Sequence, residues 1–265
     1  IISRECPEMR ITCSHSLGRI GLLERENATL LNAALLDLAA NTTDAFRTAL
    51  DEVGITAPLY ITLNDGTVTS AKLARKFPVY CFASGPTNSM RGAAFLSGID
   101  NAIVCDVGGT TADIGCLING FPREANNVVE VGGVRTLFRM PDLISIGIGG
   151  GTIVHENPLS VGPDSVGFRL LEEARVFGGS RLTLTDIAVA SGLMDVGGKA
   201  QTSDIPKTLI EAALDSAHQK IAVTVDQIKT DSQDMPMIAV GGGAPLIPEK
   251  IPGIVIHSAN IQNLS

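Results

Sequence analysis

The sequence predicts an α/β fold, in which strands and helices alternate along the chain and pack in layers. Two observations carry this prediction. Residues 102–105 and 237–240 are short and almost wholly apolar, which is typical of strands that are buried on both faces of a sheet. Apolar residues recur at steps of three and four over 24–52 and again over 209–228, which is typical of amphipathic helices.

The first third of the chain is predicted to begin with a helix over 24–52, which Gly54 ends. Residues 58–63 alternate and are β-branched, so they predict a strand, and the Asn-Gly-like turn at 64–66 follows it. A short strand-like run over 79–83 leads into a turn at 84–88 and a helix over 89–96. The apolar stripe of the first helix is expected to be Leu31, Leu35, Leu38, Thr42, Ala45 and Ala49.

The rest of the chain is predicted to add strands over 114–118 and 254–256 to the two buried ones. Residues 155–203 read as loop-rich, with helices near 166–177 and 185–192. Ser203 or Asp204 is expected to cap a long final helix. The buried stripe of that helix is predicted to be Leu209, Ala213, Ala217, Ile221, Val225 and Ile228.

Composition excludes several classes of protein. The chain has 265 residues, 45% hydrophobic and 18% charged, which excludes wholesale disorder. A net charge of −8 without basic clusters argues against nucleic-acid binding, and no apolar stretch is long enough to cross a membrane. The five cysteines include no Cys-x-x-Cys pair, so we expect buried, reduced thiols and a cytoplasmic location. His218, within the last long helix, is expected on the surface.

The most informative segment is the glycine turn after the strand at 102–105. The strand delivers Asp106, Gly108 and Gly109 make a tight turn, Thr110 and Thr111 follow, and Asp113 opens the next strand. Paired glycines let backbone N–H groups approach phosphate oxygens closely. The threonine hydroxyls add donors, and the two carboxylates suit a magnesium ion, usually through its waters.

The order of elements separates this turn from other phosphate-binding loops. Dinucleotide fingerprints and Walker A loops run from a strand through glycines into a helix, whereas here the glycines lead into a second strand. No lysine follows them, so a Walker A loop is excluded. Two further glycine runs, at 147–151 and at Gly241, Gly242 and Gly243, follow apolar runs as well. Three such turns together predict a nucleotide site.

These residues resemble the hydantoinase A / 5-oxoprolinase family, which includes N-methylhydantoinases and belongs to the actin/Hsp70/sugar-kinase ATPase superfold. The resemblance spans nearly the whole chain. It is carried by the segments 14–19, 64–66, 84–86, 106–113, 149–152, 161–165, 185–186 and 241–243. It departs from the family pattern at Ile144-Ser145, where many members have His-Thr, and after Ser165, where they have a longer loop.

The resemblance implies an actin/Hsp70-like (ribonuclease H-like) ATPase lobe with a mixed sheet, flanking helices and a β-hairpin phosphate clasp. Family members carry an earlier Asp-x-Gly-Gly-Thr hairpin, so residues 1–265 are expected to be the second lobe of a longer protein, with 155–203 as an insertion and the first lobe absent. The implied activity is ATP- and metal-dependent hydrolysis of a small cyclic amide, hydantoin or 5-oxoproline, through a phosphorylated intermediate. A hydantoinase B-like partner subunit is also implied.

In that reading Asp106 and Asp113 are the catalytic and metal-binding residues, with magnesium as the expected metal. The residues from Gly108 to Thr111 hold phosphates, and those from Gly241 to Gly243 back the adenosine of ATP. Two alternatives stay open. One is a non-catalytic nucleotide-binding or assembly subunit of a hydantoinase- or carboxylase-type complex. The other is a relative of the small-molecule kinases.

Overall fold

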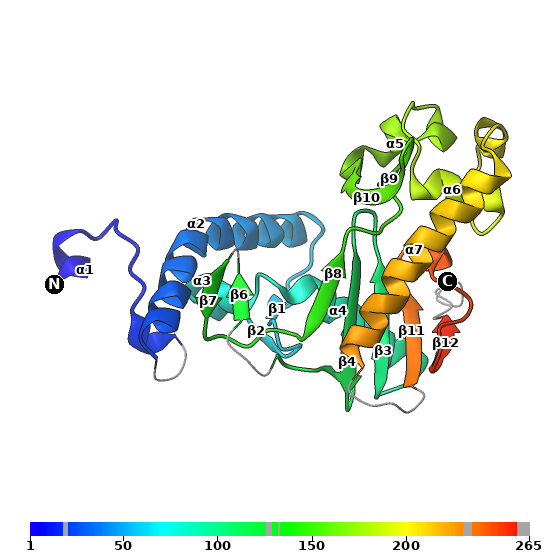
Figure 1. The fold of residues 1–265 in the computed structure, drawn as a ribbon. Helices are drawn as coiled ribbons and strands as arrows, with labels where there is room; N and C mark the ends of the chain where they lie inside the picture. Colours follow the sequence, from blue (N-terminus) through cyan, green and yellow to red (C-terminus); the bar gives the residue numbers. More distant parts are fainter. Residues whose placement is uncertain (18–20, 126–128, 132, 230–234, 259–265) are drawn as a thin grey trace. The chain divides into compact units, whose positions relative to one another are not determined.

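The computed structural model describes residues 1–17, 21–125, 129–131, 133–229 and 235–258 (Figure 1). The chain forms two compact units. Unit 1 comprises Ile1–Asn88 and Glu124–Asp142, and unit 2 comprises Ser89–Arg123 and Leu143–Ser265. The expectation of a single second lobe concerns the longer polypeptide and stays a prediction.

Unit 1 combines one long helix with two small antiparallel hairpins. β1 pairs with β2 across the predicted turn, and β6 pairs with β7. A small core forms around the buried side chains of Leu17, Ala28, Val79 and Phe138. The elements are α1 (Ile2–Glu5), η1 (Ser14–Ser16), α2 (Leu23–Glu52), β1 (Tyr60–Thr62), β2 (Val68–Ser70), α3 (Ala71–Lys76), η2 (Pro78–Tyr80), β6 (Val129–Val131) and β7 (Val134–Thr136).

Helix α2 lies where the sequence predicts it, but the predicted stripe is wrong in its second half. Leu38 is 63% exposed, whereas Asn32, Ala40 and Thr43 are buried. Asn32 explains the choice of face, because Nδ2 donates to the carbonyl oxygen of Lys76 at 3.1 Å and Oδ1 accepts from the amide of Val79 at 3.4 Å. This polar anchor selects the face that packs against α3 and η2, and hydrophobic spacing alone does not reveal it.

The strand-like run at 79–83 is not a strand. Pro78 begins the 3-10 turn η2, and the backbone on either side is held by one side chain. Nδ2 of Asn64 donates to the carbonyl oxygen of Val79, and its Oδ1 accepts from the amide of Ala83, both at 3.0 Å. Helix α4 (Ser84–Ser97) starts earlier than predicted, because Pro86 is compatible with the first turn of a helix.

Unit 2 is built on a mixed sheet, in which six of the described strands take part. β11 runs parallel to β12 and β3, whereas β4 runs antiparallel to β3, β5 and β8. The strands are β3 (Ala102–Val107), β4 (Ala112–Ile118), β5 (Phe121–Pro122), β8 (Leu143–Ile146), β11 (Met235–Val240) and β12 (Ile254–Ser258). The four predicted strands in this unit are confirmed, and the architecture is α/β.

Helices cover both faces of the central strands. Ile103 and Cys105 of β3 pack in the same cluster as Ala213 and Ile221 of α7 (Lys207–Ile228), which crosses the sheet in orange in Figure 1. The alternate residues of β3, among them Val104, pack with the part of α4 that belongs to unit 2. The predicted stripe of α7 is confirmed. The predicted cap at Ser203 or Asp204 is wrong. Pro206 disfavours a helical conformation at Ile205, so α7 begins at Lys207, directly after the proline.

The segment expected to be loop-rich contains an unpredicted hairpin of β9 (Thr152–Glu156) and β10 (Leu159–Ser165). The helix predicted over 166–177 is divided into η3 (Gly167–Arg169), α5 (Leu170–Glu173) and η4 (Arg175–Phe177), because Ala174 is extended and bridges to Arg181. Helix α6 (Leu184–Ser191) is confirmed, and η5 (Lys199–Thr202) and η6 (Ala244–Leu246) complete the unit. That 155–203 is an insertion stays a prediction.

No helix within the described ranges combines the length and apolar character that crossing a membrane requires. The five cysteines are free thiols, but they are not all buried as expected: Cys105 and Cys116 are buried, Cys6 and Cys81 are half-buried, and Cys13 is exposed. Burial, together with the nearby charges of Asp106 and Asp113, raises the pKa of Cys105 to about 12, so this thiol stays protonated at neutral pH. Cys105 is therefore a core residue and not a nucleophile.

Candidate functional site

The three glycine segments come together at one end of the sheet in unit 2. The first is the turn that joins β3 to β4, closed by a 2.9 Å hydrogen bond from the Gly108 amide to the carbonyl oxygen of Thr111. Gly109 and Thr110 form its exposed tip. In the described part of the chain, no group accepts a hydrogen bond from the amide of either residue. The hairpin tip therefore has two backbone donors that no described group engages.

The middle run folds back onto this hairpin. The amide of Gly150 donates to the carbonyl oxygen of Gly108 at 2.9 Å, and the amide of Gly151 donates to that of Gly109 at 2.6 Å. Thr185, at the start of α6, in turn donates to the carbonyl oxygen of Gly150 through its amide and its hydroxyl, both at 2.9 Å. The carbonyl groups of Gly108 and Gly109 thus accept hydrogen bonds from the middle run, whereas no described group accepts from the amides of Gly109 and Thr110.

The third run supports the hairpin from the side of β11. The amide of Gly243 donates to the carbonyl oxygen of Val107 at 2.8 Å, directly before the turn. Gly241 has a φ of +88°, and Gly242 is exposed with open space around the position of a Cβ atom. The glycine run thus turns sharply over the end of β3 and leaves its central residue accessible.

Close approach of backbones explains two of these glycines. A Cβ atom on Gly149 would lie 2.7 Å from the backbone nitrogen of Thr110 and 2.8 Å from the carbonyl oxygen of Gly108. A Cβ atom on Gly241 would lie 2.4 Å from the carbonyl oxygen of Val107, and also 2.4 Å from a carboxylate oxygen of Asp106. These distances are far below van der Waals contact, and backbone cannot rotate away as a side chain can. The two runs hold the hairpin and Asp106 in place only because both positions lack a side chain.

The two predicted carboxylates face each other across the hairpin. Asp106 on β3 is the register partner of Asp113 on β4, and both are half-buried. The hydroxyl of Ser145 on β8 donates to Oδ1 of Asp113. Burial raises the pKa of Asp113, the hydrogen bond from Ser145 lowers it, and the nearby charge of Asp106 raises it. Neutralising this pair of negative charges with a cation would favour the ionised state of both groups.

The donor set fits a phosphate group. Two backbone amides without an acceptor among the described residues and the hydroxyls of Thr110 and Thr111 lie within three successive residues, and backbone N–H groups in such a turn form an anion-binding concavity. The fit to a metal is narrower. Among the residues described, no three or more His, Cys, Asp or Glu side chains are grouped to hold an ion. Magnesium commonly binds through one or two carboxylates together with waters and phosphate oxygens, which matches Asp106 and Asp113.

Sequence reasoning missed two contributors and misjudged one residue. Ser145 and Thr185 contact the site from β8 and α6, and although both positions lie in segments compared with the family pattern, neither was assigned to the site. His218 was expected on the surface but is half-buried on α7. Burial lowers its pKa, while Asp215 and a hydrogen bond with the backbone of Leu246 raise it. His218 therefore belongs to the packing between α7 and η6.

Comparison with known proteins places this arrangement in a family. The family model for hydantoinase/oxoprolinase matches residues 25–197. Caprolactamase subunit alpha of Pseudomonas jessenii is 26% identical over 82% of this chain and 32% of its own length. The acetophenone carboxylase gamma subunit of Aromatoleum aromaticum is 28% identical over 70% of this chain and 26% of its own length.

Solved structures share the fold. The nucleotide-free acetone carboxylase structure matches with a TM-score of 0.65 and 20% identity over 87% of this chain and 37% of its own. The ATP-dependent caprolactamase of Pseudomonas jessenii matches with a TM-score of 0.65 and 20% identity over 91% and 39%. The predicted fold class, an actin/Hsp70-like lobe with a mixed sheet and flanking helices, is confirmed. The chain spans about a third of the length of these relatives. Its match to the family model covers well over half of its residues, so the chain belongs to the hydantoinase/oxoprolinase family.

Proposed function

We propose that the polypeptide containing this chain uses ATP and a divalent metal, magnesium, to hydrolyse a small cyclic amide of the hydantoin or 5-oxoproline type. One observation carries the proposal. Three glycine turns converge on a hairpin whose tip amides are unpaired among the described residues and whose two carboxylates face each other. This combination has a simple use in holding the phosphates and the metal of a nucleotide.

Each part of the site has a role in this proposal. The amides of Gly109 and Thr110 bind phosphate oxygens, the hydroxyls of Thr110 and Thr111 add donors, and Gly108 sets the turn. Asp106 and Asp113 hold the metal through its waters, and Ser145 keeps the carboxylate of Asp113 oriented. Residues 241–243 lie beside the hairpin, and Gly242 offers an open backbone surface for the adenosine.

ATP supplies the phosphoryl group that turns the amide oxygen into part of a leaving group, and the residues of this chain act by positioning and charge neutralisation. The network behind the hairpin serves that task. Because Gly150 and Gly151 occupy the carbonyl groups of Gly108 and Gly109, these oxygens do not face the phosphates with negative partial charge. The hairpin is therefore held with its donors directed toward the ligand before the ligand binds.

The relatives support this chemistry and also a second candidate. An ATP-dependent caprolactamase acts on a cyclic amide, which agrees with hydrolysis. The similarity to the acetophenone carboxylase gamma subunit favours ATP-dependent carboxylation as the alternative. Both curated relatives are named as subunits, which supports a partner of the hydantoinase B type in addition to a first lobe of the same polypeptide. The free thiols support a cytoplasmic location.

The test is Asp113→Asn in the full-length protein. The substitution keeps the shape of the side chain and an oxygen that can accept from Ser145, but removes the charge that would hold the metal. We expect ATP turnover to fall by about a hundredfold, because removal of one preorganised electrostatic contact costs roughly 2.7–4 kcal/mol. Asp226→Asn, on the exposed surface of α7, is the matched control and should leave turnover unchanged.

Two results would count against the proposal. Unchanged ATP turnover and unchanged magnesium dependence in Asp113→Asn would remove Asp113 from the site. Turnover of ATP by the wild type that no cyclic amide stimulates would remove the substrate class. Stimulation by a ketone and bicarbonate in place of an amide would decide for carboxylation.

A further inference from the structure

Unit 1 contains a second polar cluster, which the nucleotide site does not use. It lies beside an open cavity of about 300 Å³ between the β1–β2 turn and residues 137–139. The walls of the cavity are largely apolar, formed by Leu63, Tyr80, Leu137 and Phe138. Two charged groups, Asp65 and Arg139, also line it. A concave apolar site with a few convergent polar groups is typical of a small-molecule site.

Hydrogen bonds of the buried Asn64 hold the turn that carries Asp65 in place. Asn64 is 2% exposed, and besides the bonds of its side chain to Val79 and Ala83, its amide donates to the carbonyl oxygen of Tyr80 at 2.7 Å. The hydroxyl of Thr87 donates to the carbonyl oxygen of Asn64 at 3.0 Å. Every polar group of Asn64 thus serves the scaffold. The backbone position of Asp65 is therefore fixed by the hydrogen bonds of its neighbour Asn64.

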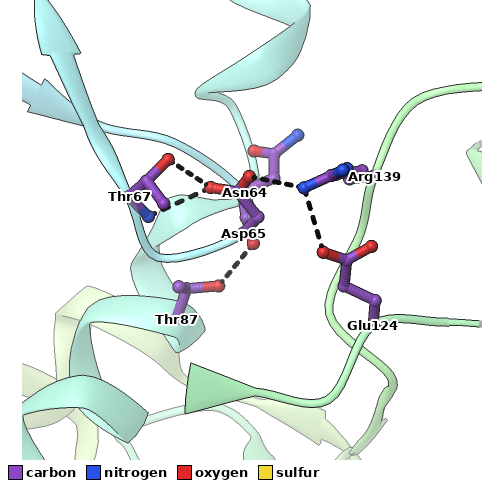
Figure 2. A network of polar contacts seen from close by, with 6 residues as sticks. All are labelled: Asn64, Asp65, Thr67, Thr87, Glu124 and Arg139. Atoms are coloured by element: carbon purple, nitrogen blue, oxygen red, sulfur yellow. Dashed lines mark hydrogen bonds and ion pairs between the residues drawn. The ribbon is translucent and has the colours of Figure 1, made fainter. Parts of the chain in front are cut away.

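Asp65 and Arg139 are less fully engaged. Oδ1 of Asp65 accepts from the amide and the hydroxyl of Thr67, at 3.0 and 2.6 Å, whereas Oδ2 lies 3.6 Å from Nη1 of Arg139. The same Nη1 lies 3.3 Å from Glu124 (Figure 2). Both ion pairs are longer than an ordinary charge-assisted hydrogen bond. Because both use Nη1, they leave Nε and Nη2 unpaired among the residues that the structure describes.

The charge of the cluster selects the kind of ligand. Asp65, Glu124 and Arg139 together carry a net charge of −1, so an anionic ligand is disfavoured at the cavity. A neutral amide fits, because its carbonyl oxygen accepts hydrogen bonds and its N–H group donates one. The guanidinium of Arg139 can donate to the carbonyl oxygen, and Oδ2 of Asp65 can accept from the N–H group. The apolar walls match the methylene groups of a ring.

We propose that this cavity binds the cyclic amide, with Arg139 donating to the amide oxygen and Asp65 accepting from the amide N–H. The inference rests on the proposed function and narrows it. It favours neutral rings, such as lactams and hydantoins, over 5-oxoproline, whose carboxylate would be repelled by Asp65 in the wall of the cavity. Asp65 and Arg139 then determine specificity for the ring.

The experiment is an NMR titration of the full-length protein, without nucleotide, with three ligands that share one ring. These are 2-pyrrolidinone, N-methyl-2-pyrrolidinone, which lacks the N–H group, and 5-oxoproline, which adds a carboxylate. We expect 2-pyrrolidinone to bind most tightly. Arg139→Gln should raise its Kd about tenfold or more, as expected for loss of a hydrogen bond to a charged group. Asp65→Asn should weaken 2-pyrrolidinone but not the N-methyl compound.

Arg135→Gln is the matched control, since Arg135 is an exposed arginine on the neighbouring strand β7 and should not change any Kd. Tighter binding of 5-oxoproline than of 2-pyrrolidinone, or an unchanged Kd in both Arg139→Gln and Asp65→Asn, would overturn the inference. Steady-state kinetics separate this failure from that of the proposed function. If an amide stimulates ATP turnover but Arg139→Gln leaves the KM for the amide unchanged, only the assignment of the amide to this cavity is refuted. If no amide stimulates ATP turnover in the wild type, both the proposed function and the assignment of the cavity are refuted.

Discussion

Gly149 offers the sharpest test of how the middle glycine run supports the hairpin. In Gly149→Ala the new methyl group would lie 2.7 Å from the backbone carbon and nitrogen of Thr110 and 2.8 Å from the carbonyl oxygen of Gly108. All three atoms belong to backbone, so relief requires the hairpin and the run to move apart. Overpacking of this kind typically costs about 1–3 kcal/mol.

That cost should appear as local opening. The hydrogen bonds from Gly150 and Gly151 to the hairpin hold the two segments together, so their amides report on the separation. A destabilisation of about 1–3 kcal/mol corresponds to roughly 5- to 150-fold faster hydrogen exchange at these amides. Mass spectrometry of the full-length protein after deuterium labelling measures this rate.

Gly109→Ala is the control, because a Cβ atom there meets nothing within 4 Å although the residue belongs to the same hairpin. Its exchange rates at residues 150 and 151 should stay close to those of the wild type. Equal rates in the two variants would refute the reasoning, since the contact distance would then have no energetic consequence. Gly149→Ala should also weaken nucleotide binding, because the donors of the tip would lose their orientation.

Two further predictions concern carboxylates of unit 2, the buried Asp186 and the half-buried Asp113. Asp186 is 0% exposed and accepts hydrogen bonds from the amide and hydroxyl of Thr183 and from the amide of Val176. Asp186→Ala leaves these donors without a partner, so it should lower the free energy of unfolding, measured in urea, by at least about 2 kcal/mol. An effect no larger than that of Asp195→Ala, at an exposed position, would contradict this. Burial raises the pKa of Asp113 above its ordinary 3.8, so the folded state holds this proton more tightly than the unfolded chain and stability falls as pH rises through the folded pKa. Asp113→Asn should therefore match the wild type in acid and gain stability relative to it toward neutral pH; a gap that narrows with rising pH would show the opposite sign.

The sequence predicts the sheet of unit 2 well, because its signals are local. Residues 102–105 and 237–240 are apolar at every position, and this pattern has few alternatives to a doubly buried strand. The stripe of α7 is equally clear, since five of its six predicted members are fully buried. Unit 1 is less predictable. There Asn32 and Asn64 organise the packing through hydrogen bonds to distant backbone, and an asparagine looks the same in sequence whether it anchors a core or faces solvent.

The candidate site shows the same division. The turn from Asp106 to Asp113 is visible in the sequence because glycines, hydroxyls and carboxylates follow one another directly. Its support by Gly150 and Gly151 is not visible, because it depends on where β8 and the β9–β10 hairpin return to the sheet. That hairpin itself escapes prediction, since the register of its two strands shifts between Val161 and Ser165 and interrupts the regular alternation. Tertiary pairing, and not local preference, decides these features.

The topology of β3 has a consequence for the order of assembly during synthesis. On one side Ile103 pairs with Cys116, a neighbour across a tight turn, and on the other side with Met237, near the far end of the described chain. Hairpins form in microseconds once their residues are present, whereas distant parallel partners must await translation of everything between them. The turn at 108–111 can thus form on the ribosome long before β11 and the last glycine run arrive to brace it. A nascent chain that stops short of residue 240 would expose the apolar edge of β3, and we expect such a truncation to require a chaperone where the finished chain does not.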